Sequence, residues 1–257
     1  MWRRSIKRLH IPSPAPILAL GCLAAITITE ALTSFGNPRA GMALYCALLA
    51  ALVIGAGFLR LAPARCLLLG VSLAPMVRIS SLALPLGGVP PALAALAAGI
   101  PPLAAGAVVV YSAGLSRQQI GLQATRLHRE GLLGSVGLLL GPLLYLAQRQ
   151  PPAGAPSLSA LWAPMLALAG VGVIEEVLFR GIMQATAVQA LGRPGILLPA
   201  ALYAVLMGSA SLFVGGVALA IGLLFGWIVQ RRSSIIGVAL AHALLNAVFI
   251  LSSAILR

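Results

Sequence analysis

The sequence predicts an all-α fold, a polytopic transmembrane helical bundle of roughly eight to nine spans. Two observations support this prediction. Hydrophobic residues make up 60% of the 257 residues and charged residues only 8%, which is too little charge to cover the surface of a soluble domain. Apolar runs of about 20 residues, long enough to cross the hydrocarbon core of a bilayer, recur along the whole chain.

The apolar runs divide the chain into nine ranges, whose boundaries are soft by several residues. They are 16–35, 41–59, 66–86, 92–114, 132–147, 160–188, 195–209, 212–229 and 234–255. With a cytoplasmic N-terminus, most of the Lys and Arg residues fall in cytoplasmic connectors. Only Arg39, Arg149 and Arg257 fall on the external side, and Arg78 and Arg180 lie within spans. Cytoplasmic connectors of membrane proteins carry this excess of cations. We therefore expect an integral protein of a bacterial plasma membrane with its N-terminus in the cytoplasm.

A connector rich in Pro, Ala and Gly at 148–159 separates two parts of the chain. The first part, 1–150, contains N-terminal transmembrane helices without a recognised motif. The second part, 151–257, contains the residues that point to chemistry. The basic balance, 17 Lys and Arg against 4 Asp and Glu, does not indicate nucleic acid binding, because no basic run is interleaved with aromatic residues.

Two of the chain's four acidic residues, Glu175 and Glu176, are neighbours within an apolar span. A charge near the bilayer centre costs about 2.5–3.5 kcal/mol, so ionisable residues there indicate a functional site. Arg180 follows Glu176 by four residues, on the same helix face, where the two can form an ion pair. Glu175 points about 100° away and is free to act as a general base. The alternative is a buried Glu–Arg pair that only joins two helices.

A second constellation lies in the last span. His242 and Asn246 are four residues apart, so the imidazole and the carboxamide share one helix face. A histidine in a membrane helix is often a hydrogen-bonded packing residue. The asparagine one turn away and the carboxylates elsewhere in the bundle favour a functional role.

The two constellations together resemble a known family. The sequences EEVLFR at 175–180 and HALLN at 242–246, in this order on late membrane helices, are similar to the first and last motifs of the CPBP family. These are the CaaX-protease and bacteriocin-processing intramembrane proteases, also called Abi proteins, and the resemblance covers about 160–255. It implies a helical bundle with a conical cavity open to the membrane. It also implies that Glu175 activates water, that Glu176 and Arg180 shape the helix, and that His242 and Asn246 stabilise the oxyanion.

One position departs from the family pattern. The family places Phe-x-x-x-His between the two motifs, and the matching stretch here runs from Tyr203 to Met207. Methionine cannot replace histidine as a base, a proton donor or a hard-metal ligand. A catalytic zinc normally has three protein ligands and water, so Glu175, His242 and Asn246 would be a poor set. The sequence therefore assigns no cofactor with certainty. Zinc stays an alternative, which Met207 weakens. The Tyr203 hydroxyl or Ser209 would have to compensate.

These residues predict an intramembrane endopeptidase of the CPBP type, which hydrolyses a membrane-associated peptide or protein near its end. The alternative is a catalytically inactive pseudoprotease that acts as a membrane binding or immunity protein. A transporter is disfavoured because interrupted helices do not recur in the two halves. Glu30 and Arg78 are the other charges within spans. They either pair across the first and third spans or each reach toward an interface, and neither enters the predicted site.

Overall fold

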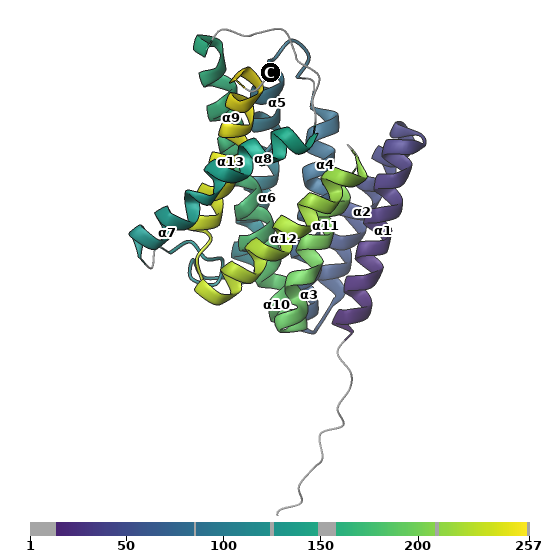
Figure 1. Ribbon diagram of the computed structural model, residues 1–257. Helices are drawn as coiled ribbons and strands as arrows, with labels where there is room; N and C mark the ends of the chain where they lie inside the picture. The colour runs from purple at the N-terminus through teal and green to yellow at the C-terminus, as the bar shows by residue number, and fades with distance from the viewer. Residues whose placement is uncertain (1–13, 85, 124–125, 149–157, 209–210, 256–257) are drawn as a thin grey trace, which may run out of the picture.

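The computed structural model describes residues 14–84, 86–123, 126–148, 158–208 and 211–255, and every regular element among them is a helix (Figure 1). Eight helical segments are long and apolar enough to cross a membrane. In hydrocarbon no water can bond the backbone N–H and C=O groups, so the chain satisfies them within helices. The predicted all-α transmembrane bundle is confirmed.

The eight segments differ in whether they are continuous. Four are single helices: α1 (Ala15–Phe35), α2 (Pro38–Phe58), α12 (Leu212–Arg232) and α13 (Ile236–Ile255). Three consist of two helices separated by one residue: α3 (Ala62–Val71) with α4 (Leu73–Ala83), α5 (Pro91–Ala98) with α6 (Ile100–Ser112), and α7 (Leu127–Gly134) with α8 (Val136–Gln148). The eighth joins α9 (Leu158–Glu176), the π-helical segment η1 (Val177–Met183) and α10 (Gln184–Leu191).

The range predicted at 195–209 is a shorter helix than a full span. It consists of η2, a 3-10 turn (Arg193–Ile196), and α11 (Leu197–Gly208). The 12 residues of α11 extend about 18 Å, against a hydrocarbon thickness of about 30 Å. Eight of the nine predicted ranges therefore correspond to candidate spans. The cytoplasmic position of the N-terminus and the bacterial membrane stay predictions.

Small residues allow α13 to lie close against its neighbours α8 and α9. A side chain at Gly137 of α8 would collide with the Ala241 carbonyl oxygen of α13. A Cβ at Gly172 of α9 would lie 3.1 Å from the His242 carbonyl carbon. Close backbone approach at such positions is how membrane helices commonly pack. This packing brings α13 beside the end of α9, where the two glutamates lie.

Helices from both parts of the chain pack against each other. In the N-terminal part, α3 packs on α10, α1 on α11 and α5 on α9, and Figure 1 shows α1 to α4 beside α10 and α11. The predicted division at 150/151 lies outside the described residues and stays a prediction. The contacts show that the N-terminal helices help to form the surroundings of the C-terminal ones.

Candidate active site

The first predicted motif lies where the helix geometry changes. Glu175 and Glu176 end α9, and the next seven residues, including Arg180, form the π-helix η1. Such wide turns are rare and often occur at functional sites. The Arg180 Nη1 lies 3.2 Å from the Glu176 Oε1. The predicted ion pair is present, although the backbone between its two residues is π-helical rather than α-helical.

His242 of α13 bridges the two carboxylates. Its Nδ1 lies 2.8 Å from the Glu176 Oε1, and its Nε2 lies 3.6 Å from the Glu175 Oε2. An ionised carboxylate can only accept hydrogen bonds, so we assign the proton at Nδ1 as the one donated to Glu176. This bond orients the ring and turns Nε2 toward Glu175. Spacing along a single helix could not show this contact between α9 and α13, and the sequence analysis missed it.

Tyr203 of α11 completes the surroundings of Glu175. Its hydroxyl donates a hydrogen bond of 3.0 Å to the Glu175 Oε2. The guanidinium carbon of Arg180 lies 4.5 Å from the centre of the Tyr203 ring, within the range of a cation–π contact. Of the two residues that the sequence offered as compensation for Met207, Tyr203 thus reaches Glu175, and Ser209 lies outside the described residues.

Asn246 is held at a different place from the other predicted site residues. Its Nδ2 donates a 3.0 Å hydrogen bond to the backbone carbonyl of Leu168. This bond ties α13 to α9 one turn beyond His242. The structure therefore brings together Glu175, Glu176, Arg180 and His242, while the Asn246 amide is bonded to the α9 backbone.

A cavity of about 190 Å³ opens beside Glu175. Met207 of α11 lines the same cavity. The remaining wall is mostly apolar and comes from α4, α5, α6 and α9. Both parts of the chain therefore enclose the space next to the candidate base.

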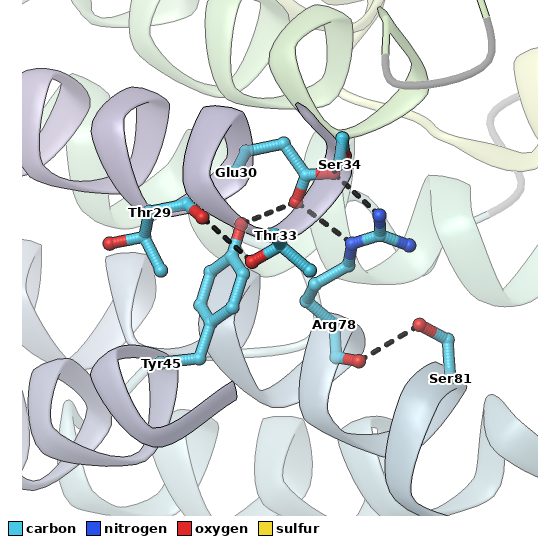
Figure 2. Close-up of polar contacts among 7 residues, drawn as sticks. All are labelled: Thr29, Glu30, Thr33, Ser34, Tyr45, Arg78 and Ser81. Carbon is cyan, nitrogen blue, oxygen red and sulfur yellow. Dashed lines mark hydrogen bonds and ion pairs between the residues drawn. The ribbon is translucent and has the colours of Figure 1, made fainter. Parts of the chain in front are cut away.

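Arg78 of α4 also lines this cavity, which the sequence analysis did not expect. Its Nε donates to the Glu30 Oε2 at 2.8 Å, and its Nη2 donates to the Glu30 Oε1. Tyr45 and Ser34 donate to the same carboxylate at 2.6 and 2.7 Å (Figure 2). Of the two alternatives left open, the pair across helices is the one present. The position of Arg78 inside an apolar span was the feature of the sequence that could have indicated its place at the site.

The pair formed by Glu176 and Arg180 is deeply buried and incompletely hydrogen-bonded. The two side chains are 0% and 2% exposed. The Glu176 Oε2 and both Nη atoms of Arg180 have no hydrogen-bond partner among the described residues. Their 3.2 Å contact is thus an ion pair without hydrogen-bond geometry. Arg180 also lines a second cavity of about 480 Å³, together with Gln118 and Gln184.

The donor set does not fit a catalytic zinc ion, which needs three protein ligands. Glu175 and the Nε2 of His242 face each other, but the Asn246 amide is bonded to Leu168 and Met207 offers only a soft thioether. Within the described part of the chain, no three His, Cys, Asp or Glu side chains form a group suited to a metal.

The comparisons with known proteins agree with this geometry. Residues 157–248 match a family model named Rce1-like, which is described as "Type II CAAX prenyl endopeptidase Rce1-like". The matched range contains the two glutamates, Arg180, Tyr203, His242 and Asn246. Comparison with curated proteins and with solved structures finds no match. The similarity to this endopeptidase family thus covers residues 157–248, which contain both predicted motifs.

Proposed function

We propose that this protein is an intramembrane endopeptidase that hydrolyses a membrane-associated peptide or protein, with Glu175 as the base that activates water. The observation that carries the proposal is the position of the Glu175 carboxylate. It lines a cavity, accepts the Tyr203 hydroxyl and faces the Nε2 of His242. A base, its orienting donor and a second proton carrier are thus in contact on three different helices.

In the proposed reaction, Glu175 removes a proton from a water molecule as the water oxygen attacks the peptide carbonyl carbon. The C–O bond forms and the carbonyl oxygen becomes an oxyanion. When the C–N bond breaks, the proton held by Glu175 passes to the leaving amine. General base catalysis of this kind typically contributes about 10²–10⁴ in rate. The Tyr203 hydroxyl fixes the Oε2 atom that takes the proton.

His242 is the candidate donor to the oxyanion. The two carboxylates and the Arg180 guanidinium leave one negative charge in this buried cluster. A proton on the His242 Nε2, which lies 3.6 Å from the Glu175 Oε2, makes the ring an imidazolium and balances that charge while Glu175 stays ionised. The Nε2–H can then point at the oxyanion, while Glu176 holds the other side of the ring. Donors preorganised in this way stabilise the charge that develops in the transition state.

We propose that water enters through the larger cavity, which the Arg180 side chain lines. At about 480 Å³, this cavity has room for several water molecules, each of which occupies about 30 Å³ in the liquid. Its wall includes Gln118, Gln184 and the Arg180 side chain, whose Nη atoms have no hydrogen-bond partner among the described residues. These donors suit a water chain that ends at the carboxylates.

Two observations favour a second function, that of an inactive member of the family that only binds a peptide or partner. Met207 places a thioether instead of a hydrogen-bond donor in the cavity beside Glu175, and the Asn246 amide donates to Leu168. Each change removes a donor that could stabilise an oxyanion. Losing one such donor typically lowers the rate about 10²–10³-fold, so a slow enzyme and a silent binding protein differ only in measured turnover.

Cleavage in water labelled with ¹⁸O separates these two functions. Purified full-length protein in nanodiscs is incubated with a library of membrane-anchored peptides, and products are identified by mass spectrometry. Hydrolysis places one ¹⁸O atom in each new carboxylate. We expect labelled products from the native protein and a loss of about 10²–10⁴-fold in Glu175→Gln.

The matched control is Glu130→Gln, the same chemical change at a glutamate outside the site. Glu130 accepts a hydrogen bond from the Gly237 N–H, and a glutamine oxygen can still accept it. This variant should retain labelled products at the native rate. If the native protein gives no labelled product above the Glu175→Gln background, the endopeptidase is excluded and the binding function remains.

A further inference from the structure

The end of α12 forms an aromatic and basic corner, which we define as Trp227, Arg231 and the two cavities beside them. The guanidinium carbon of Arg231 lies 5.5 Å from the centre of the Trp227 ring. A cavity of about 400 Å³ lies between α7 and α12, and a second of about 540 Å³ lies between η2 and α12. Both cavities are lined by Trp227 and Arg231, so they meet at this corner.

The corner collects cations from three elements. Arg129 of α7 and Arg232 of α12 line the first cavity, and Arg193 of η2 lines the second. The Arg232 Nη1 contacts the Arg129 carbonyl oxygen at 3.5 Å, so these two elements approach each other through the arginines. Both cavities are therefore lined by basic side chains.

Among the residues that the structure describes, no carboxylate forms an ion pair with these arginines. The chain has only four acidic residues, and all of them are used elsewhere. Glu30 pairs with Arg78, Glu175 and Glu176 lie in the candidate active site, and Glu130 is buried with its Oε2 on the Gly237 N–H. Among the described residues, ion pairs involve only Arg78, Arg180 and His242 on the basic side. The positive charge of the corner thus faces outward without compensation.

The corner occupies the end of a candidate membrane span, where we expect lipid headgroups. The 21 residues of α12 form a candidate span, and Arg231 and Arg232 occupy its last turn. Trp227 comes one turn earlier, about 6 Å deeper at 1.5 Å per residue, and is 49% exposed. Tryptophan at this depth is typical of the membrane interface. Exposed Leu132 and Leu197 continue the two cavities with apolar surface.

We propose that this corner is a binding site for an anionic phospholipid. The phosphate accepts hydrogen bonds from Arg231 and from Arg193 or Arg129, since guanidinium groups match the geometry of phosphate oxygens. The parts of the acyl chains nearest the headgroup lie along Trp227 and the neighbouring leucines. A zwitterionic lipid fits less well, because its headgroup cation would meet further arginines and no carboxylate. Basic pockets between membrane helices are known to bind anionic headgroups in this way.

The test counts bound lipids on the full-length protein by native mass spectrometry. Phosphatidylglycerol and phosphatidylcholine with the same acyl chains are titrated against the native protein and against Arg193→Gln/Arg231→Gln. One arginine near an anionic lipid surface contributes about 1 kcal/mol. The double variant should therefore bind phosphatidylglycerol about 10–30-fold more weakly, with phosphatidylcholine binding unchanged.

Arg60→Gln/Arg65→Gln is the matched control, since it removes the same charge from two exposed arginines outside both cavities. Arg60 and Arg65 lie at the start of α3, which packs on α10. The chain continues from α10 into η2, which contains Arg193, and Figure 1 shows α3 and α10 at the same end of the bundle. The control should bind phosphatidylglycerol like the native protein. Trp227→Leu, which changes no charge, should weaken phosphatidylglycerol binding several-fold.

Three outcomes would overturn the proposal. An equal loss in both arginine pairs would mean that only the overall positive charge attracts the lipid. Equal binding of the two lipids to the native protein would remove the anionic preference. Inorganic phosphate that competes fully with phosphatidylglycerol would show a free-anion site instead. Unchanged thermal unfolding of every variant in phosphatidylcholine micelles confirms that it is folded, and none of these readouts depends on peptide cleavage.

Discussion

Two Glu–Arg pairs among the described residues differ in how completely they are hydrogen-bonded, and the Arg78 side chain is 20% exposed whereas that of Arg180 is 2% exposed. Each carboxylate oxygen of Glu30 accepts two donors, from Arg78 together with Tyr45 or Ser34 (Figure 2). In the pair of Glu176 and Arg180, one carboxylate oxygen and both Nη atoms have no hydrogen-bond partner among the described residues. The first pair joins α1 to α4, and the second lies within one helix, beside the candidate base.

This difference separates a network that stabilises the fold from one that takes part in the proposed reaction. Leaving a buried polar group without a partner costs about 1–3 kcal/mol, more if it is charged, so unsatisfied groups in a native protein need an explanation. The Glu30 network shows that this chain can satisfy a buried pair fully. We infer that the cluster at Glu176 keeps open positions because water or substrate uses them, while the Glu30 network stabilises the N-terminal helices.

The largest effect is expected from breaking the satisfied pair. Glu30→Leu leaves the Arg78 charge without its partner in the bundle, and removing one member of a buried pair typically costs about 3–5 kcal/mol. The free energy of unfolding, measured by detergent titration in mixed micelles, should fall by this amount.

The double variant Glu30→Leu/Arg78→Met is the control for this prediction. It removes both charges, so most of the lost stability should return, because a buried pair can often be replaced by apolar residues without cost. A double variant as unstable as Glu30→Leu would mean that the hydrogen bonds of Tyr45 and Ser34, rather than the charge pairing, dominate the network.

A smaller effect is expected from adding a donor to the open cluster. Met207 lines the cavity beside Glu175, so Met207→His would place an imidazole at the position that the resemblance aligns with the family's middle-motif histidine. Cleavage should rise by up to about 10²-fold, the value of one oxyanion donor, or the variant should bind zinc. Peptide turnover and metal content of the purified variant check this prediction. Unchanged turnover without bound zinc would show that the stretch from Tyr203 to Met207 does not correspond to the family's middle motif.

Most of the fold could be predicted from composition and the lengths of apolar runs. Hydrocarbon forces a buried backbone into helices, so eight of the nine ranges became candidate spans. The range at 195–209 was wrong as a full span. Its residues are as apolar as the others, and hydropathy does not show that η2 and the connector before it occupy part of the run.

The candidate site could be predicted only where its contacts are local in sequence. Helical spacing gave the pair of Glu176 and Arg180, four residues apart. The bond from His242 to Glu176 and the one from Tyr203 to Glu175 join residues 66 and 28 positions apart. Such contacts depend on how each helix is rotated against the next, which a uniformly apolar helix does not reveal. The same limit hid the contribution of Arg78 to the cavity.

The two tyrosines that donate to the two clusters allow the most direct test of this division. Tyr45→Phe and Tyr203→Phe each remove one buried hydroxyl that donates to a carboxylate, and a hydrogen bond to a charged group contributes about 1.5–3 kcal/mol. Unfolding free energy and ¹⁸O-labelled cleavage are measured for both variants. We expect Tyr45→Phe to lose about 1.5–3 kcal/mol of stability with native cleavage. Tyr203→Phe should lose about 10–100-fold in cleavage with a smaller loss of stability, because the Glu175 side chain is 20% exposed and water can replace the hydroxyl. Equal losses of stability in both variants, with cleavage unaffected by Tyr203→Phe, would contradict the assignment of the Glu175 cluster as the working site.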